Sequence, residues 1–155
     1  MRIVIDMQGA QTESRFRGIG RYTLEFTKAV VRNRGDSEIV LALSGFFPET
    51  IKPLRAEFHG LLPQENIRVW YAPGSVKDED PKNENRREVA ELIREAFIGS
   101  LNPDIIHINS LFEGYVDNAV TSVGRFDRNT PVSVTLYDLI PCLLYTSPIP
   151  RDRTR

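Results

Sequence analysis

The chain has little of several features that mark specialised classes of protein. Its 155 residues include one cysteine, two histidines and one tryptophan, and its formal net charge is -1. A single cysteine excludes a disulfide framework, and the balanced charge argues against a nucleic-acid partner, because counterion release requires a concentrated basic face. No run approaches the roughly 18 consecutive apolar residues of a membrane-spanning helix. The opening residues MRIVIDMQGA reach an acid at Asp6, which excludes a signal peptide and predicts a cytoplasmic protein.

The remaining composition is that of a soluble globular domain. Hydrophobic residues make up 41% of the chain and charged residues 26%, which suits one domain with a core. The last residues, CLLYTSPIPRDRTR, show no helix or strand period. They closely resemble a translated transposase-type sequencing adapter, CLLYTSPSPRD, from which Ile149 departs. We therefore interpret residues 142–155, with Cys142, as a non-native tail and expect the natural protein to continue beyond Pro141. The alternative is a natural tail that ends the chain.

Between residues 1 and 141, segments typical of strands alternate with segments typical of helices. The strand segments are short, rich in β-branched or aromatic residues and nearly continuously apolar, which suits strands covered on both faces. They are residues 2–6, 38–43, 67–72, 104–109 and 132–137. Helices are predicted for residues 18–35, 48–61, 89–101 and 115–123, and a solvated loop for residues 73–87. This alternation predicts an α/β fold with a doubly wound, mostly parallel Rossmann-like sheet.

The apolar positions of two helices predict which face each one buries. For the first helix the predicted buried stripe is Ile19, Tyr22, Phe26, Ala29 and Val30. For the stronger helix it is Val89, Leu92, Ile93, Ala96, Phe97 and Leu101. That choice leaves the charged residues of the same helix facing water, namely Glu88, Glu91, Arg94 and Glu95.

In such a sheet ligands bind at the carboxyl ends of the strands, so the stretch FRGIGRYTLEF after the first strand is a candidate site. A helix that opens at Gly18 directs its free N–H groups and positive dipole end toward that edge, where a phosphate is favoured. Gly18 and Gly20 leave room for close approach, and Arg21 adds charge. The dinucleotide fingerprint is absent, because Thr23 occupies the third glycine position and residues 7–17 form too long a connection. The residues alone support an anion site and a plain glycine-rich helix entry equally. If the first is right, Gly20→Val removes activity and leaves the fold largely intact.

Four segments occur in an informative order: RIVIDMQGA, the long loop into GIGRYTLEF, NPDIIHINSLFEG and PVSVTLYDLIP. Together they resemble the N-terminal domain of family-4 retaining glycosyltransferases of the GT-B architecture, near the bacterial mannosyltransferases that assemble surface polysaccharide. The resemblance covers residues 1–141. It implies a partial, acceptor-side half of a two-domain enzyme, whose C-terminal nucleotide-sugar domain would follow Pro141. The fragment alone would then be inactive.

The resemblance also implies a reaction. A hexosyl group, with mannosyl favoured, passes from a nucleotide sugar, with GDP-mannose favoured, to a lipid-linked or oligosaccharide acceptor, and the anomeric configuration is retained. No cofactor and no metal is implied, and no catalytic residue is assigned. Substrate-binding roles are implied for Gly18, Ile19, Gly20, Arg21, Tyr22, Ser110, Glu113, Tyr137 and Asp138. Many members carry histidine at the position of Tyr137, where tyrosine can donate a hydrogen bond but cannot act as a positive group.

Several single residues have a structural interpretation beside a functional one. His107 is predicted to be a core or cleft-floor residue rather than a metal ligand, since no second ligand stands at suitable spacing, and His59 is predicted to lie on the surface. Asp6 either orients Arg21 or the acceptor, or serves as a structural cap. One group is predicted to pack in the core, the alternative being peripheral contact with lipid or a lipid-linked acceptor at the inner face of the membrane: Phe46, Phe47, Leu54, Arg55 and Phe58.

Two other functions stay open on the sequence. A nucleotide-dependent oxidoreductase or epimerase shares the fold class, although the fingerprint fails and the second strand lacks a following acid for a ribose hydroxyl. A non-catalytic module that binds a sugar or a protein partner is the other, and it requires that the natural chain end near residue 155.

Overall fold

The computed structural model, which describes residues 1–137, contains a five-stranded parallel sheet with the strand order β3-β2-β1-β4-β5. The strands are β1 (Arg2–Asp6), β2 (Glu38–Ser44), β3 (Ile67–Trp70), β4 (Ile105–Ile108) and β5 (Val132–Val134). The predicted doubly wound parallel sheet is therefore confirmed. β3 and β5 end earlier than predicted, and Asp138 lies outside the described residues.

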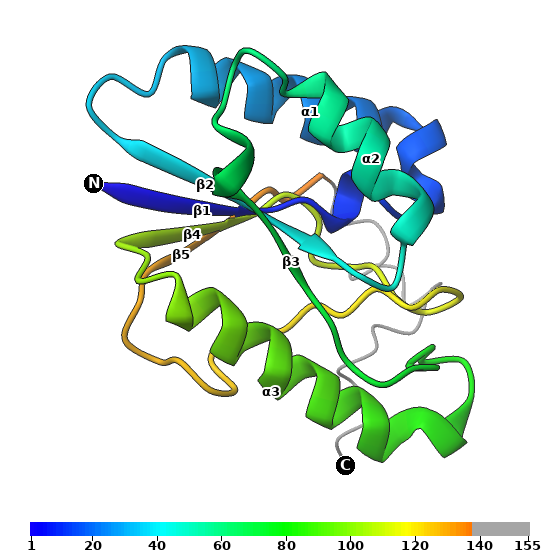
Figure 1. Cartoon of the computed structure of the whole chain (residues 1–155). Coiled ribbons are helices and arrows are strands. Elements are labelled where there is room, and N and C mark those ends of the chain that lie inside the picture. Colours follow the sequence, from blue (N-terminus) through cyan, green and yellow to red (C-terminus); the bar gives the residue numbers. More distant parts are fainter. Residues whose placement is uncertain (138–155) are drawn as a thin grey trace.

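Helices cover both faces of this sheet (Figure 1). Helices α1 (Gly18–Arg32) and α2 (Pro48–Glu57) lie on one face, and α3 (Glu84–Ser100) lies on the other. Residues 1–137 also contain four single turns of 3-10 helix: η1 (Gln8–Ala10), η2 (Glu13–Phe16), η3 (Gln64–Asn66) and η4 (Pro81–Asn83). No helix among residues 1–137 is both long enough and apolar enough to cross a membrane.

The central strand β1 shows why the strand sequences are nearly continuously apolar. Successive side chains point to opposite faces, so Ile5 packs under α1 and α2 while Val4 packs against α3. Val4 pairs in register with Val40 of β2 and Ile106 of β4, which belong to the same core cluster. Both faces of the strand therefore contribute to a hydrophobic core.

Helix α1 buries a different face from the predicted one. Its buried residues are small or β-branched, namely Gly20, Thr23, Thr27 and Val31. Of the predicted stripe, Tyr22 and Ala29 are exposed, and the other members are only half-buried. The reason is close packing, because a Cβ on Gly9 would lie 2.7 Å from the Thr23 hydroxyl oxygen. A large aromatic side chain has no room on that face.

Helix α3 departs from its predicted orientation more strongly. Val89 and Leu92 are exposed, whereas Glu91, Arg94 and Glu95, predicted to face water, are buried. These polar side chains bond residues 109–131, which contain no helix, so the predicted helix at 115–123 is wrong. A buried irregular segment needs partners for its backbone groups, and α3 supplies them. The helix also begins at Glu84, inside the segment predicted to be a loop.

Candidate functional site

Two buried glutamines fix the loop that leads from β1 into α1. Gln8 donates from Nε2 to the Val120 carbonyl (2.7 Å) and accepts from the Val120 N–H (2.9 Å). Gln11 holds the backbone of Ser44 in the same way, with distances of 3.0 and 2.7 Å. Each side-chain amide thus pairs with the N–H and C=O of a single residue, which is the last residue of β2 for Gln11 and a residue of the segment between β4 and β5 for Gln8. Sequence reasoning missed both residues, although QGAQ follows the first strand after a single intervening residue, Met7.

The first turn of α1 opens at the carboxyl edge of the sheet, as predicted. No side chain caps its N-terminus, and no acid stands in its first turn, so its free N–H groups and dipole favour an anion. Gly18 is exposed, with open space where a Cβ would stand. Arg21 is exposed beside it.

Gly20 does not have the predicted role of leaving space for a ligand. A Cβ there would lie 2.2 Å from the Arg15 Cα and 2.6 Å from the Ser14 carbonyl oxygen. The missing side chain therefore leaves room for η2 and not for a ligand. The expectation that Gly20→Val spares the fold is wrong, because the added atoms would collide with backbone.

The other predicted site residues among residues 1–137 come together next to this turn. Ser110 follows β4, and a Cβ on Gly9 would lie 3.3 Å from the Ser110 Cβ and 3.7 Å from Ile19 Cγ2. The Ser110 hydroxyl donates to Glu113 Oε1 at 2.9 Å. The ring of Tyr137, after β5, meets the ring of Tyr22 edge-on, with centroids 5.5 Å apart.

Burial changes the acidity of two groups in this cluster. It raises the pKa of Glu113 above its ordinary 4.5, although hydrogen bonds from Ser110 and Ser14 oppose the change. It also raises the pKa of Tyr137 above 10.0, so the phenol keeps its proton near neutral pH. The edge therefore presents the protonated phenol of Tyr137, the hydroxyl of Ser110 and the carboxyl group of Glu113, whose pKa is raised, beside the N-terminus of α1. Such a set can hydrogen-bond a sugar hydroxyl and hold a phosphate.

This chain is similar to part of a mannosyltransferase. It is 31% identical over 144 residues to the serotype-specific mannosyltransferase WbdA of Escherichia coli, an alignment that covers 92% of this chain and 17% of that protein. Two further relatives of the same description from Escherichia coli are each 25% identical over 118 residues, covering 76% of this chain and 14% of each relative. The chain thus spans less than a fifth of the length of these curated relatives. No family model matches the sequence, and no solved structure matches it.

Asp6 has a structural role in a buried ion pair. It is buried and forms an ion pair with the guanidinium of Arg94, whose Nε donates to Asp6 Oδ2 at 2.8 Å, and the N–H of Gln8 donates to Asp6 Oδ1 at 2.9 Å. The ion pair connects the end of β1 to α3. The suggestion that Asp6 orients Arg21 is therefore wrong, because its carboxylate is engaged on the opposite side.

The remaining single residues follow their structural interpretations. His107 is half-buried in β4, where its Nδ1 lies 3.2 Å from the Ser133 hydroxyl and burial lowers its pKa. His59 is exposed, as predicted. Phe47, Leu54 and Phe58 are buried, so these side chains are not available for the alternative contact with lipid.

Proposed function

We propose that residues 1–141 form part of the N-terminal, acceptor-side domain of a retaining glycosyltransferase of the GT-B architecture. In this proposal a hexosyl group, with mannosyl favoured, moves from GDP-mannose or a related nucleotide sugar to a lipid-linked or oligosaccharide acceptor in bacterial surface polysaccharide synthesis. The enzyme would work in the cytoplasm or at the inner face of the membrane. The observation that carries the proposal is the 31% identity to a mannosyltransferase over 92% of this chain.

The geometry of the carboxyl edge supports a division of roles. Negative charge grows on the leaving diphosphate during transfer, and a site must meet it with cations or helix N-termini. The uncapped first turn of α1, with Gly18 open and Arg21 exposed, suits that task. Ser110, Glu113 and Tyr137 suit hydrogen bonds to hydroxyl groups of the sugar ring or of the acceptor. A second domain would provide the other wall and most of the nucleotide contacts.

The oxidoreductase alternative is less well supported. A dinucleotide fingerprint requires a tight glycine turn directly between the first strand and its helix. Residues 7–17 instead form η1 and η2, and Gly20 packs against the latter.

Mannosyl transfer by the product of the complete reading frame that encodes this chain tests the proposal. We expect GDP release from GDP-mannose in the presence of a mannose-terminated acceptor, with an α-linked product by NMR. Tyr137→Phe should reduce the rate by about tenfold or less, since one hydrogen bond is lost. Failure to transfer from any nucleotide sugar, together with tight binding of a nicotinamide cofactor, would refute the proposal in favour of an oxidoreductase.

A further inference from the structure

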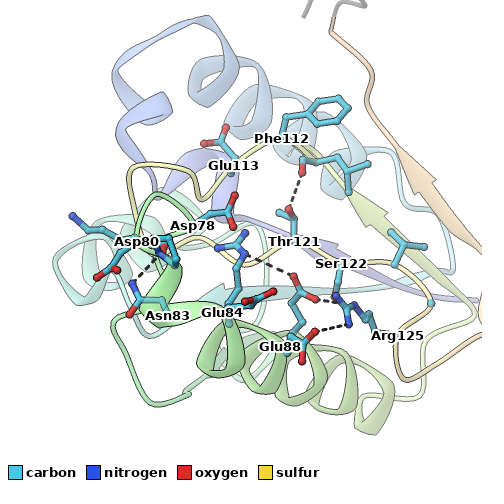
Figure 2. Close-up of a pocket in the computed structure, with 17 residues that line it drawn as sticks. Asp78, Asp80, Asn83, Glu84, Glu88, Phe112, Glu113, Thr121, Ser122 and Arg125 are labelled. Atoms are coloured by element: carbon cyan, nitrogen blue, oxygen red, sulfur yellow. Dashed lines mark hydrogen bonds and ion pairs between the residues drawn. The ribbon is translucent and has the colours of Figure 1, made fainter. Parts of the chain in front are cut away.

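A pocket of about 540 Å³ opens between the N-terminal half of α3 and residues 111–125. Its volume falls within the range of about 300–1,000 Å³ that is usual for small-molecule sites. Figure 2 shows Phe112 and Glu113 across the pocket from α3, and Thr121 between them and the helix. Of its lining residues, sequence reasoning gave a role only to Glu113, because it predicted that the charged face of α3 would be in water.

Carboxyl groups outnumber cations in the lining. The acids are Asp78, Asp80, Glu84, Glu88, Glu91 and Glu113. The cations are Lys77, Arg87 and Arg125. Like charges at close range repel a phosphate group strongly where water is partly excluded. The diphosphate of a donor is therefore excluded here and is directed to the helix N-terminus of α1.

The two arginines of the pocket are already engaged by the protein. Arg87 is buried, and its Nη1 donates to the carbonyls of Val76 (2.8 Å), Ala119 (3.1 Å) and Gly114 (3.3 Å). Arg125 pairs with Glu91 at 2.9 Å and with Glu88 at 3.7 Å. The guanidinium groups thus hold the pocket wall in place, and an anionic ligand would have to displace these bonds.

At least one carboxylate oxygen has no such engagement. Asp78 Oδ2 is buried and has no hydrogen-bond partner among the described residues. A buried acceptor without a partner costs free energy, so a hydroxyl donor from a ligand would favour a turn of the pocket-lining Asp78 side chain that brings this oxygen into the pocket. Phe112, half of whose surface is exposed (51%), adds an apolar face to the same pocket. Carboxylate acceptors beside an aromatic face suit a ligand that carries many hydroxyl groups and no charge.

Glu113 connects this pocket to the cluster at the carboxyl edge. It lines the pocket, and its Oε1 accepts the hydrogen bond from Ser110. We infer that the pocket holds an uncharged hexose unit of the acceptor glycan, whose growing end reaches the cluster at Glu113. This inference rests on the proposed function, and it assigns the acceptor glycan to the α3 side of the sheet.

NMR titration of the ¹⁵N-labelled 155-residue chain with mannobiose tests the inference. We expect amide shifts in residues 77–91 and 111–125. Asp78→Asn should weaken mannobiose binding about tenfold, since a charge-assisted hydrogen bond is lost, without lowering the melting temperature, because Asp78 Oδ2 has no hydrogen-bond partner to lose among the described residues. Phe112→Ala should weaken binding by a similar factor. Glu65→Gln, an exposed acid of η3 that does not line the pocket, is the control and should bind like the unaltered chain.

The outcomes separate this inference from the proposed function. Mannobiose shifts confined to residues 18–22, no shifts at all, or unchanged affinity in Asp78→Asn would overturn the pocket assignment. Shifts of the pocket amides with Mg²⁺ or spermidine but not with mannobiose would also overturn it, in favour of a cation site. Mannobiose bound in the pocket while the complete enzyme transfers no sugar would refute the transferase and leave a sugar-binding site. Sugar transfer by the complete enzyme without mannobiose bound in the pocket would support the transferase and refute the pocket assignment.

Discussion

Removing the guanidinium of Arg94 should be among the most damaging single changes to the fold. Arg94 is 1% exposed and Asp6 is 2% exposed. Arg94→Met keeps most of the side-chain volume but leaves the Asp6 carboxylate without its counter-charge, and it removes a 3.2 Å bond to the Ser122 carbonyl. Breaking a buried ion pair costs about 3–5 kcal/mol. We expect about 3 kcal/mol, because the N–H and side-chain amide of Gln8 still donate to Asp6.

That loss is large against the stability of about 5–15 kcal/mol that is usual for a domain. Urea unfolding can be followed through the fluorescence of Trp70, which is the single tryptophan and is 2% exposed. Glu38→Gln is the matched control, because it breaks the exposed pair with Arg2 and should cost at most about 1 kcal/mol. Asp6→Asn should restore part of the stability of Arg94→Met by removing the buried charge. A loss in Arg94→Met no larger than in the control would refute this reasoning.

Three further predictions concern other parts of the chain. Gly20→Ala should cost about 1–3 kcal/mol in urea unfolding because its Cβ collides with η2, whereas Gly18→Ala should change stability by less than about 1 kcal/mol; equal effects would contradict the assigned packing. Leu92→Gln should cost at most about 0.5 kcal/mol, but Ile98→Ala about 2–5 kcal/mol, and the reverse order would mean that α3 is rotated. Folding favours protonated Glu113, so its carboxylate lowers stability as pH rises from 4.5 through the raised pKa. Glu113→Gln should reduce that slope in unfolding measured across this range, while the part due to Asp117, whose pKa burial also raises, should remain; an unchanged slope would refute the assignment.

The sheet could be predicted because its signal is local. Short apolar segments such as RIVID and EIVLAL are buried on both faces whatever surrounds them, so composition alone identifies them. The carboxyl-edge cluster followed from the same step, since the exits of parallel strands meet at one edge. Ser110 and Glu113 lie in such an exit and could be named in this way, whereas Tyr22 and Tyr137 were named only through the resemblance to glycosyltransferases.

The helix faces could not be predicted because their burial depends on distant segments. Arg94 and Glu95 are buried because residues 109–131 lie over them without secondary structure and need hydrogen-bond partners. The hydrophobic pattern of the α3 sequence carries no information about the hydrogen-bond partners that residues 109–131 require. The exposed position of Tyr22 likewise follows from the close contact between Gly9 and Thr23. These two residues belong to segments that lie apart in the sequence, so the pattern of α1 alone does not reveal the contact. The α3 side of the pocket was missed for the same reason.

The two glutamine clamps have a consequence for how the molecule responds to its surroundings. A neutral amide neither titrates nor attracts salt, so Gln8 and Gln11 hold the start of α1 against its neighbours at any pH or ionic strength at which the chain is folded. The carboxyl side of the same edge, at Glu113, does respond to protons. Acidification would therefore alter hydroxyl recognition there and leave the anchoring of the anion-facing helix unchanged. The glutamine contacts therefore stay the same across pH, while the hydrogen bonding of Glu113 at the same edge changes with it.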